Sequence, residues 1–250
     1  MQRLESGVGT ASLWRRTQRR LLSRLRRLEP YRVVVQGGIR VHYKPHLDGG
    51  GTTFGQEFVP FLRGRGMPTQ RRVFEWCAGP GFIGFAMLGD GLCESLCLAD
   101  VNAAAVVACE RTVRANRLTD RVSIYRSDNL AQIPQAERWD LVVGNPPHHA
   151  DLYADSASRG DLRCFDGGWE THRTFFRQVG PFLKPGGVIV LQENNQGSTP
   201  ETFQHMLEDG GFRIAFVHGS ESQRTREARF YFMGVVRAGD TPPAWARSLT

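Results

Sequence analysis

The sequence predicts an α/β fold whose core is a seven-stranded, mostly parallel sheet with helices on both faces and a C-terminal antiparallel hairpin. Three observations lead to this prediction. From residue 72 onward, short apolar segments alternate with segments of helical periodicity, which is typical of parallel sheets covered by helices. Unusual glycine, acidic and asparagine residues follow the apolar segments, at the edge where such sheets bind ligands. The last two apolar segments, 212–218 and 228–236, look like an antiparallel pair.

We expect the elements of this core in a regular order. The other strands are predicted near 72–77, 95–99, 121–126, 139–144 and 187–193. The helices are predicted near 82–89, 102–117, 169–183 and 200–210. Ahead of the core, residues 31–43 alternate in polarity around two glycines, which predicts a β-hairpin. The chain thus divides into a basic helical arm over 1–30, a hairpin and glycine-rich loop over 31–70, and the core domain over 71–240.

The net charge of the chain is concentrated in the arm. Residues 1–28 hold eight arginines and one acid, which leaves 24 basic and 24 acidic residues for the rest of the chain. Leu21, Leu25 and Leu28 follow one another at helical spacing and predict an amphipathic helix. Three roles are open for it: a helix docked on the domain, a contact with nucleic acid or an acidic partner, and an Arg-rich transit peptide. We favour the docked helix.

Composition excludes several classes of protein. A hydrophobic content of 40% supplies a proper core and argues against global disorder. No apolar stretch is long enough to span a bilayer, and the N-terminal residues do not resemble a secretory signal. The five cysteines form no repeating frame, which predicts free and largely buried thiols. We therefore expect a cytoplasmic protein without a membrane partner, and leave its oligomeric state open.

A glycine-rich turn follows the first predicted core strand. Residues 75–84 read E-W-C-A-G-P-G-F-I-G, in which Gly79, Gly81 and Gly84 complete the pattern G-x-G-x-x-G. Glycines at such a turn let backbone N–H groups approach a ligand closely. Asp100 ends the next strand and offers a carboxylate to the hydroxyls of a ribose. These features fit either a nicotinamide dinucleotide or S-adenosylmethionine.

Glu75 favours S-adenosylmethionine. It lies at the strand end, where a carboxylate would meet the cationic amino-acid end of that cofactor but would repel a pyrophosphate. After the third strand, Asp128 is placed for the adenine amino group and Leu130 for the face of the ring, although an Asx turn explains Asp128 equally well. Thr53 and Phe54, in the loop ahead of the core, are candidate contacts of the methionine end, with a flexible linker as the alternative.

A rigid loop follows the fourth core strand, where Asn145 precedes two prolines and His148. The prolines fix two φ angles and force an extended turn. The Asn145 side chain and the carbonyl of Pro146 would both accept hydrogen bonds from a planar N–H₂ group, and so hold its nitrogen in line with a methyl donor. His148 would stack on the flat face of the substrate or act as a general base.

These motifs resemble class I S-adenosylmethionine-dependent methyltransferases of the small-domain group, which have a Rossmann-like fold and a fourth motif that reads N-P-P followed by an aromatic residue. The group includes glutamine methyltransferases of release factors and base N-methyltransferases of ribosomal and transfer RNA. The resemblance covers residues from about 50 to 236. The matching positions are Glu75, Ala78, Gly79, Gly81, Gly84, Asp100, Asp128, Asn145, Pro146 and Pro147, and the segments 166–170 and 183–187 are also similar. His148 departs from the pattern, because this position is usually Tyr or Phe.

The residue patterns and the resemblance together give a candidate site. The catalytic residues expected are Asn145, Pro146 and His148. The cofactor contacts expected are Thr53, Phe54, Glu75, Ala78, Gly79, Gly81, Phe82, Asp100, Val101, Asp128, Asn129, Leu130 and Asn145. The substrate contacts expected are Pro147, His148, His149, Tyr153 and Trp169, most of them in the long connection over 148–168. We expect no metal site, because His148 and His149 lack a third ligand at suitable spacing.

The function that these residues predict is methyl transfer to a planar amide, amine or base nitrogen. The acceptor is open: the arginine-rich arm favours an RNA base, the release-factor-like motifs favour a protein amide, and the neutral core favours a small molecule, for which His148 would be the general base. A nicotinamide-dependent oxidoreductase is an alternative, but it leaves the N-P-P motif unexplained. A non-catalytic binding module is a third possibility, and the intact Glu75, Asp100 and Asn145 argue against it.

Overall fold

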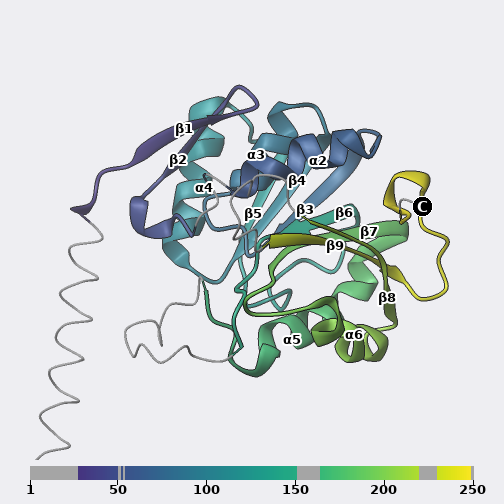
Figure 1. Ribbon diagram of the computed structural model, residues 1–250. Coiled ribbons are helices and arrows are strands. Elements are labelled where there is room, and N and C mark those ends of the chain that lie inside the picture. Colours follow the sequence, from purple (N-terminus) through teal and green to yellow (C-terminus); the bar gives the residue numbers. More distant parts are fainter. Residues whose placement is uncertain (1–27, 50–51, 53, 151–163, 220–229, 249–250) are drawn as a thin grey trace, which may run out of the picture.

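The computed structural model describes residues 28–49, 52, 54–150, 164–219 and 230–248. A seven-stranded sheet organises this part of the chain (Figure 1). From one edge to the other its strands are β5 (Val122–Arg126), β4 (Cys93–Asp100), β3 (Gln70–Trp76), β6 (Trp139–Gly144), β7 (Leu183–Asn194), β9 (Phe230–Arg237) and β8 (Phe212–Gly219). The five strands from β5 to β7 are parallel, and β9 pairs antiparallel with both β7 and β8. The predicted fold class, with its C-terminal antiparallel hairpin, is confirmed.

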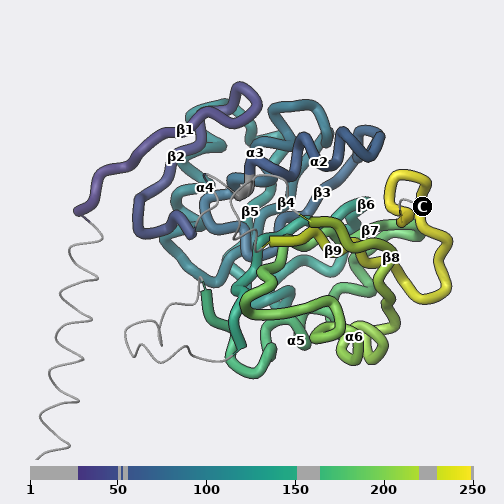
Figure 2. The backbone as a smooth tube through the Cα atoms, viewed as in Figure 1, coloured from purple at the N-terminus to yellow at the C-terminus, as the bar shows by residue number. Residues whose placement is uncertain are grey.

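Helices cover both faces of this sheet (Figures 1 and 2). One face carries α2 (Phe58–Gly64), α3 (Phe82–Gly89) and α4 (Ala103–Asn116). The other carries α5 (Glu170–Val179) and α6 (Pro200–Asp209). Each face has its own core of buried apolar side chains, as expected for a sheet that is covered on both sides.

Strand β7 shows how the two cores are separated. Val188 and Val190 belong to the core on the side of α2 and α3, whereas Ile189 and Leu191 belong to the core on the side of α5 and α6. All four are buried, which is typical of a central strand in a parallel sheet. By the same alternation, Glu193 at the end of the strand faces the side of α5 and α6. A carboxylate is thereby placed at the edge of an apolar core.

The predicted N-terminal hairpin is present as a separate two-stranded sheet, β1 (Arg32–Gln36) with β2 (Ile39–Tyr43). The hairpin packs on α4, where the His42 N–H donates to the Thr112 hydroxyl at 2.9 Å. Its turn also touches the end of α3, because a Cβ at Gly37 would lie 2.6 Å from a backbone nitrogen just beyond that helix. The hairpin is therefore packed against the domain that follows it.

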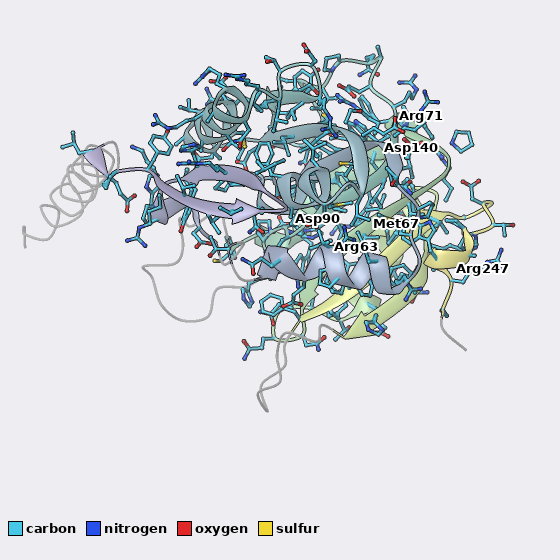
Figure 3. The ribbon with its side chains drawn as sticks, turned by 90° about the horizontal axis from the view of Figure 1, so that it is seen from above. Arg63, Met67, Arg71, Asp90, Asp140 and Arg247 are labelled. Atoms are coloured by element: carbon cyan, nitrogen blue, oxygen red, sulfur yellow. The ribbon has the colours of Figure 1, made fainter. Side chains whose placement is uncertain are left out.

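Helix α2 is an element that the sequence does not predict, because Pro60 argues against a helix interior. In the structure Pro60 is the third residue of the helix, in the first turn, where a missing N–H removes no helical hydrogen bond. The helix is tied to the end of α3 by Arg63, whose guanidinium donates to the carbonyl oxygen of Asp90 at 2.7 Å (Figure 3). Tertiary packing thus stabilises a helix that local sequence disfavours.

Two predicted boundaries move at the junction of α5 and β7. The helix expected to reach residue 183 ends at Val179, because Gly180 and Pro181 turn the chain into a short 3-10 helix over Gly180–Phe182. The strand expected from 187 begins at Leu183, which pairs with Trp139 ahead of a register shift. The apolar pattern alone does not reveal this early start.

Several predicted features lie outside the described residues. These are the arm over 1–27, Thr53, Tyr153 and most of the connection between 148 and 168, and their roles stay predictions. Where the chain is described, no helix combines the length and the apolarity needed to cross a bilayer. Cys93, Cys97 and Cys109 are free and buried thiols, as predicted.

Candidate active site

A cleft lies at the carboxyl ends of β3 and β6, where the order of strands along the sheet changes direction. From β3 the sheet grows toward β4 and β5 on one side, and toward β6 and β7 on the other. Trp76 is in register with Gly144 on the neighbouring parallel strand, so that the residues following them leave the sheet side by side. At this carboxyl edge lies a cleft of about 750 Å³, which is the size and the place expected for the ligand site of such a fold.

The cleft brings together most of the residues predicted for the site. Those that line it are Glu75, Ala78, Gly79, Phe82, Asp100, Val101, Asp128, Asn129, Asn145 and Pro147. Gly81 is not among the lining residues and is the N-cap of α3, directly before Phe82. Cofactor candidates from the ends of β3, β4 and β5 thus line the same cleft as acceptor candidates from the loop after β6.

The glycine-rich turn adopts a backbone that favours glycine. Gly79 and Gly81 have φ angles of 50° and 81°, and Cys77 between strand and turn has a φ of 52°. The left-handed region costs a side-chain-bearing residue about 1–2 kcal/mol, so Cys77 is a strained residue of the kind found at functional sites. Gly84 is required for a different reason, since a Cβ there would lie 2.7 Å from the Glu75 carboxylate.

Glu75 is 2% exposed and supports the turn from below. Its carboxylate accepts hydrogen bonds from the Gly84 N–H at 2.7 Å and the Ile83 N–H at 3.3 Å, at the start of α3. Burial outweighs these hydrogen bonds and raises the pKa of Glu75 to about 8. The group lines the cleft as a carboxyl whose charge would be favoured by a bound cation.

Asp100 holds the glycine-rich turn at Gly79. Its two oxygens accept hydrogen bonds from the Gly79 N–H at 2.7 Å and the Asn102 N–H at 2.8 Å. Burial raises the pKa of Asp100, although both hydrogen bonds oppose the shift. Asn102 in turn begins α4 by accepting from the Ala104 N–H at 3.0 Å. This turn is held by backbone contacts and is pre-formed.

Of the residues that follow β5, Asp128 and Asn129 line the cleft and Leu130 lies in the core. Asp128 is exposed at the cleft, and Asn129 accepts a hydrogen bond from the Trp76 indole at 3.1 Å. Leu130 is 2% exposed and belongs to the core beside α5, where its N–H donates to Gln178. The chain turns at Asn129, with a φ of 49°, and Leu130 lies in the core outside the lining of the cleft; its contact with an adenine ring stays a prediction.

Asn145 supplies a polar group on the acceptor side of the cleft. Its side-chain oxygen is buried and has no hydrogen-bond partner among the described residues. An unsatisfied buried acceptor costs about 1–3 kcal/mol, and in native proteins it calls for an explanation such as a ligand. Pro147, Phe165 and Thr171 line the cleft as well. The position of Asn145 fits the predicted grip on a substrate N–H.

Three predicted substrate residues take other positions. His148 is outside the lining of the cleft, with its Nδ1 3.4 Å from Glu193 and its ring edge-to-face with Phe230. Trp169 packs edge-to-face on Phe203 in the core instead of facing the cleft. His149 forms a short parallel bridge with the segment around Phe165. Partners outside the cleft hold both rings, and the stacking of His148 and Trp169 on a substrate stays a prediction.

A buried ionic cluster that the sequence does not predict lies behind the N-P-P-H loop. His172 and Glu193 have side chains with no exposed surface. The Nδ1 of His172 lies 2.7 Å from Asp166, and its Nε2 lies 3.2 Å from Glu193. Burial by itself would lower the pKa of His172, but the charge of Glu193 and the hydrogen bond with Asp166 raise it to about 9. The same imidazolium outweighs burial to lower the pKa of both carboxyls.

A signal for this cluster exists in the sequence, although it is faint. Glu193 is one of three consecutive polar residues that end a strand buried on both faces of the sheet, and His172 lies on the apolar face of an amphipathic helix. Polar residues at buried positions need partners, which a single sequence does not identify. Phe165 and Thr171, two of the lining residues that the sequence does not single out, carry no comparable signal. Across the described residues, no grouping of three or more His, Cys, Asp or Glu side chains is suited to a metal ion.

The chain is similar in sequence to known methyltransferases. The family model described as methyltransferase small domain matches residues 46–211, more than half of the chain. Ribosomal RNA small subunit methyltransferase C of Shewanella sp. strain MR-4 is 36% identical over 120 residues, which cover 48% of this chain and 32% of the relative. The corresponding protein of Shewanella loihica is 30% identical over 58% of this chain and 35% of its own length. The chain spans about a third of the length of these relatives.

Solved structures show the same fold. The 16S rRNA N2 G1207 methyltransferase (RsmC) of T. Thermophilus, in complex with AdoMet and guanosine, superposes with a TM-score of 0.56 at 18% identity, covering 82% of this chain and 50% of that one. Ribosomal protein L11 methylase of Lactobacillus delbrueckii subsp. bulgaricus superposes with a TM-score of 0.54 at 15% identity, covering 75% of this chain and 80% of that one. At these identities the likeness concerns the fold.

Proposed function

The chain belongs to the methyltransferase small domain family, a group of class I enzymes that use S-adenosylmethionine, and from this premise we propose that it methylates an amino nitrogen of a guanine base in ribosomal RNA. The acceptor is the part of this proposal that goes beyond family membership. The relatives named ribosomal RNA methyltransferases and the neighbour with guanosine in its complex support it. The family match leaves the nicotinamide-dependent alternative without support.

One observation is central to the proposal. Asn145, whose side-chain oxygen is buried without a hydrogen-bond partner among the described residues, lines the same cleft as Glu75 and Asp100. A hydrogen-bond acceptor on a residue of this cleft suits an N–H₂ group. Acceptor and cofactor would then meet inside one cavity, as in-line transfer requires.

The residues of the cleft fit S-adenosylmethionine. Glu75 is a buried carboxyl that a cationic amino-acid end would stabilise in its charged form. Asp100 is held at the rim by two backbone N–H groups and would face the ribose. Asp128 is an exposed carboxylate that lines the cleft after β5, and it would accept from the adenine amino group. The bound cofactor would supply a methyl group on a sulfonium, which is transferred without a covalent enzyme intermediate.

The chain would act on the acceptor by holding it. Asn145 accepts one N–H hydrogen bond, and the carbonyl of Pro146 accepts the other. Both draw the lone pair of the nitrogen away from the base and toward the methyl donor. The two prolines keep these acceptors rigid, so that little ordering is left to the reaction itself. The proton of the methylated nitrogen leaves afterward to solvent, and no general base is required in the cleft.

The acceptor can be identified with one labelling experiment. The protein is incubated with tritiated S-adenosylmethionine and with RNA, protein and small-molecule fractions from cells that lack its gene. Label in the RNA fraction, recovered as a methylated guanosine after digestion, is expected. As a matched control, an RNA substrate is prepared with inosine, which lacks the 2-amino group, and this RNA should take up no label. Label confined to the protein or small-molecule fraction would reject the proposal.

A further inference from the structure

Four buried or nearly buried ionisable residues form a continuous chain behind the N-P-P-H loop: His148, Glu193, His172 and Asp166. His148 belongs to the loop after β6, Glu193 to the end of β7, His172 to the first turn of α5, and Asp166 to the segment just before the short 3-10 helix Gly167–Trp169 that leads into α5. These three segments lie beside one another at the carboxyl edge of the sheet (Figure 1). This series of ionisable residues therefore joins the N-P-P-H loop to β7 and to the segment that begins α5.

Each link in this chain is fixed by the next. Asp166 accepts from the backbone N–H groups of Thr171 at 2.8 Å and His172 at 3.1 Å, which anchors it to the first turn of α5. His172 faces a carboxylate with each ring nitrogen, an arrangement that only the imidazolium satisfies as a donor on both sides. Glu193 is thus held through one oxygen by a cation and presents its other oxygen to His148.

Burying this cluster has a high desolvation cost compared with an apolar core. His172 contacts the rings of Trp76, Trp169 and Phe203, so its charge lies among aromatic side chains. Buried ion pairs of this kind contribute little to stability, and apolar residues of similar volume often replace them without loss. A role in stability alone therefore explains the cluster poorly, and buried ionic groups next to a ligand cleft are typical of functional sites.

Both ends of the cluster reach the acceptor half of the cleft. At one end, His148 directly follows Pro147, which lines the cleft beside Asn145. At the other end, Asp166 directly follows Phe165 and accepts from the N–H of Thr171, and both of these residues line the cleft. Because two prolines stiffen the connection from Asn145 to His148, the position of the His148 ring constrains the position of Asn145.

We propose that Glu193 is a positioning residue, which holds His148 and through it the N-P-P-H loop, so that the oxygen of Asn145 is aimed at the acceptor nitrogen. The inference rests on the proposed function, since it assigns a cause to the geometry of the same site. It gives His148 a role different from stacking or general-base catalysis: the ring is an anchor for the loop.

The direct test is Glu193→Gln, which keeps the shape of the side chain and removes its charge. The variant is expected to bind S-adenosylhomocysteine within about threefold of wild type, because the cofactor half is untouched, and to lose at least about tenfold in kcat. Glu137→Gln is the matched control: Glu137 is a carboxylate of low exposure that pairs with Arg72, on the other side of the domain from the loop. This control should keep kcat whatever it costs in stability.

A double-variant cycle separates positioning from a merely structural role. If Glu193 acts through His148, then His148→Ala should lower kcat by a similar factor, and the double variant should be no slower than Glu193→Gln alone. His148→Gln, which keeps a donor at this place, should recover part of the rate. Losses that multiply in the double variant would overturn the proposal. Should Glu193→Gln fail to fold, His148→Ala breaks the same link from the loop side and gives the same readout.

One readout needs no methyl acceptor. The side-chain N–H₂ resonances of Asn145, followed by NMR, are expected to shift in Glu193→Gln and in His148→Ala but not in Glu137→Gln. Unchanged Asn145 resonances in both variants of the link would overturn the inference even if methyl transfer to RNA is found. Shifted resonances together with an acceptor other than RNA would sustain it and reject only the proposed acceptor.

Discussion

Glu75 at the end of β3 and Asn145 directly after β6 line the same cleft, although they are distant in the chain. The register between the two strands, with Trp76 opposite Gly144, brings their carboxyl ends together. A buried carboxyl suited to a cationic cofactor and an unsatisfied acceptor suited to a substrate N–H therefore belong to residues that line one cleft. This relationship is the physical basis of the proposed methyl transfer.

The raised pKa of Glu75 predicts that cofactor binding releases a proton. With a pKa of about 8, the carboxyl is mostly protonated at pH 7, and a bound ammonium group would lower this pKa. Calorimetric titration with S-adenosylhomocysteine in buffers of different ionisation enthalpy should show release approaching about one proton. Glu75→Gln should bind more weakly and release markedly less. Equal release by the variant would show that the proton comes from another group.

Asp100 is expected to contribute to cofactor affinity. Asp100→Asn keeps one oxygen for the backbone but loses the charge that two N–H groups and a ribose would share. Charge-assisted hydrogen bonds contribute roughly 1.5–3 kcal/mol, so the Kd for S-adenosylhomocysteine should rise about 10- to 150-fold. Asp140→Asn is the control, because Asp140 pairs with Lys184 at the start of β6, away from the cleft. An unchanged Kd for Asp100→Asn would remove this residue from the site.

Close packing at Gly84 is expected to make Gly84→Ala destabilising. The new Cβ would lie 2.7 Å from the Glu75 carboxylate and from Leu96, so the carboxylate must move from the start of α3. Overpacking of this kind costs about 1–3 kcal/mol of unfolding free energy, measurable by urea denaturation. Gly64→Ala in α2 has open space and should be neutral or slightly stabilising. Equal stability of the two variants would contradict the close approach.

The buried imidazolium of His172 predicts a loss of stability at alkaline pH. Its folded pKa of about 9 lies above the ordinary value of 6.5, so its contribution is fully present below pH 6.5 and is lost as the pH rises through 9. The shift corresponds to about 3 kcal/mol of unfolding free energy. Urea denaturation at pH 6.5 and at pH 10 should show this loss in wild type and a smaller one in His172→Gln. Parallel pH profiles would mean that His172 is buried neutral.

Much of the fold follows from local patterns in the sequence. The helix over Phe82–Gly89 and the strand over Trp139–Gly144 lie where the sequence predicts them, because each is an almost uninterrupted apolar segment and the alternation of the βα units assigns its type. Helix α2 is missed, since Pro60 argues against it locally and packing against α3 decides otherwise. The early start of β7 is missed for the same kind of reason, as a register shift extends the strand through Lys184-Pro185-Gly186.

The site divides in a similar way. Glu75, Asp100 and Asn145 are predictable because each follows or ends a parallel strand, and the backbone alone brings such positions to one edge. The directions of the His148 and Leu130 side chains are not, since each depends on a partner from a distant element: Glu193 for the ring, and the core beside α5 for the leucine. Local sequence places a residue in the chain, whereas packing decides where its side chain points.

The most direct test of the central claim is the rate of methyl transfer by Asn145→Ala under single-turnover conditions, with calorimetric affinity for S-adenosylhomocysteine measured beside it. The account predicts transfer slower by roughly 100-fold or more, because one of two acceptors on the substrate nitrogen is lost, with a far smaller change in cofactor affinity. A variant that transfers methyl groups at the rate of the wild type would contradict the account.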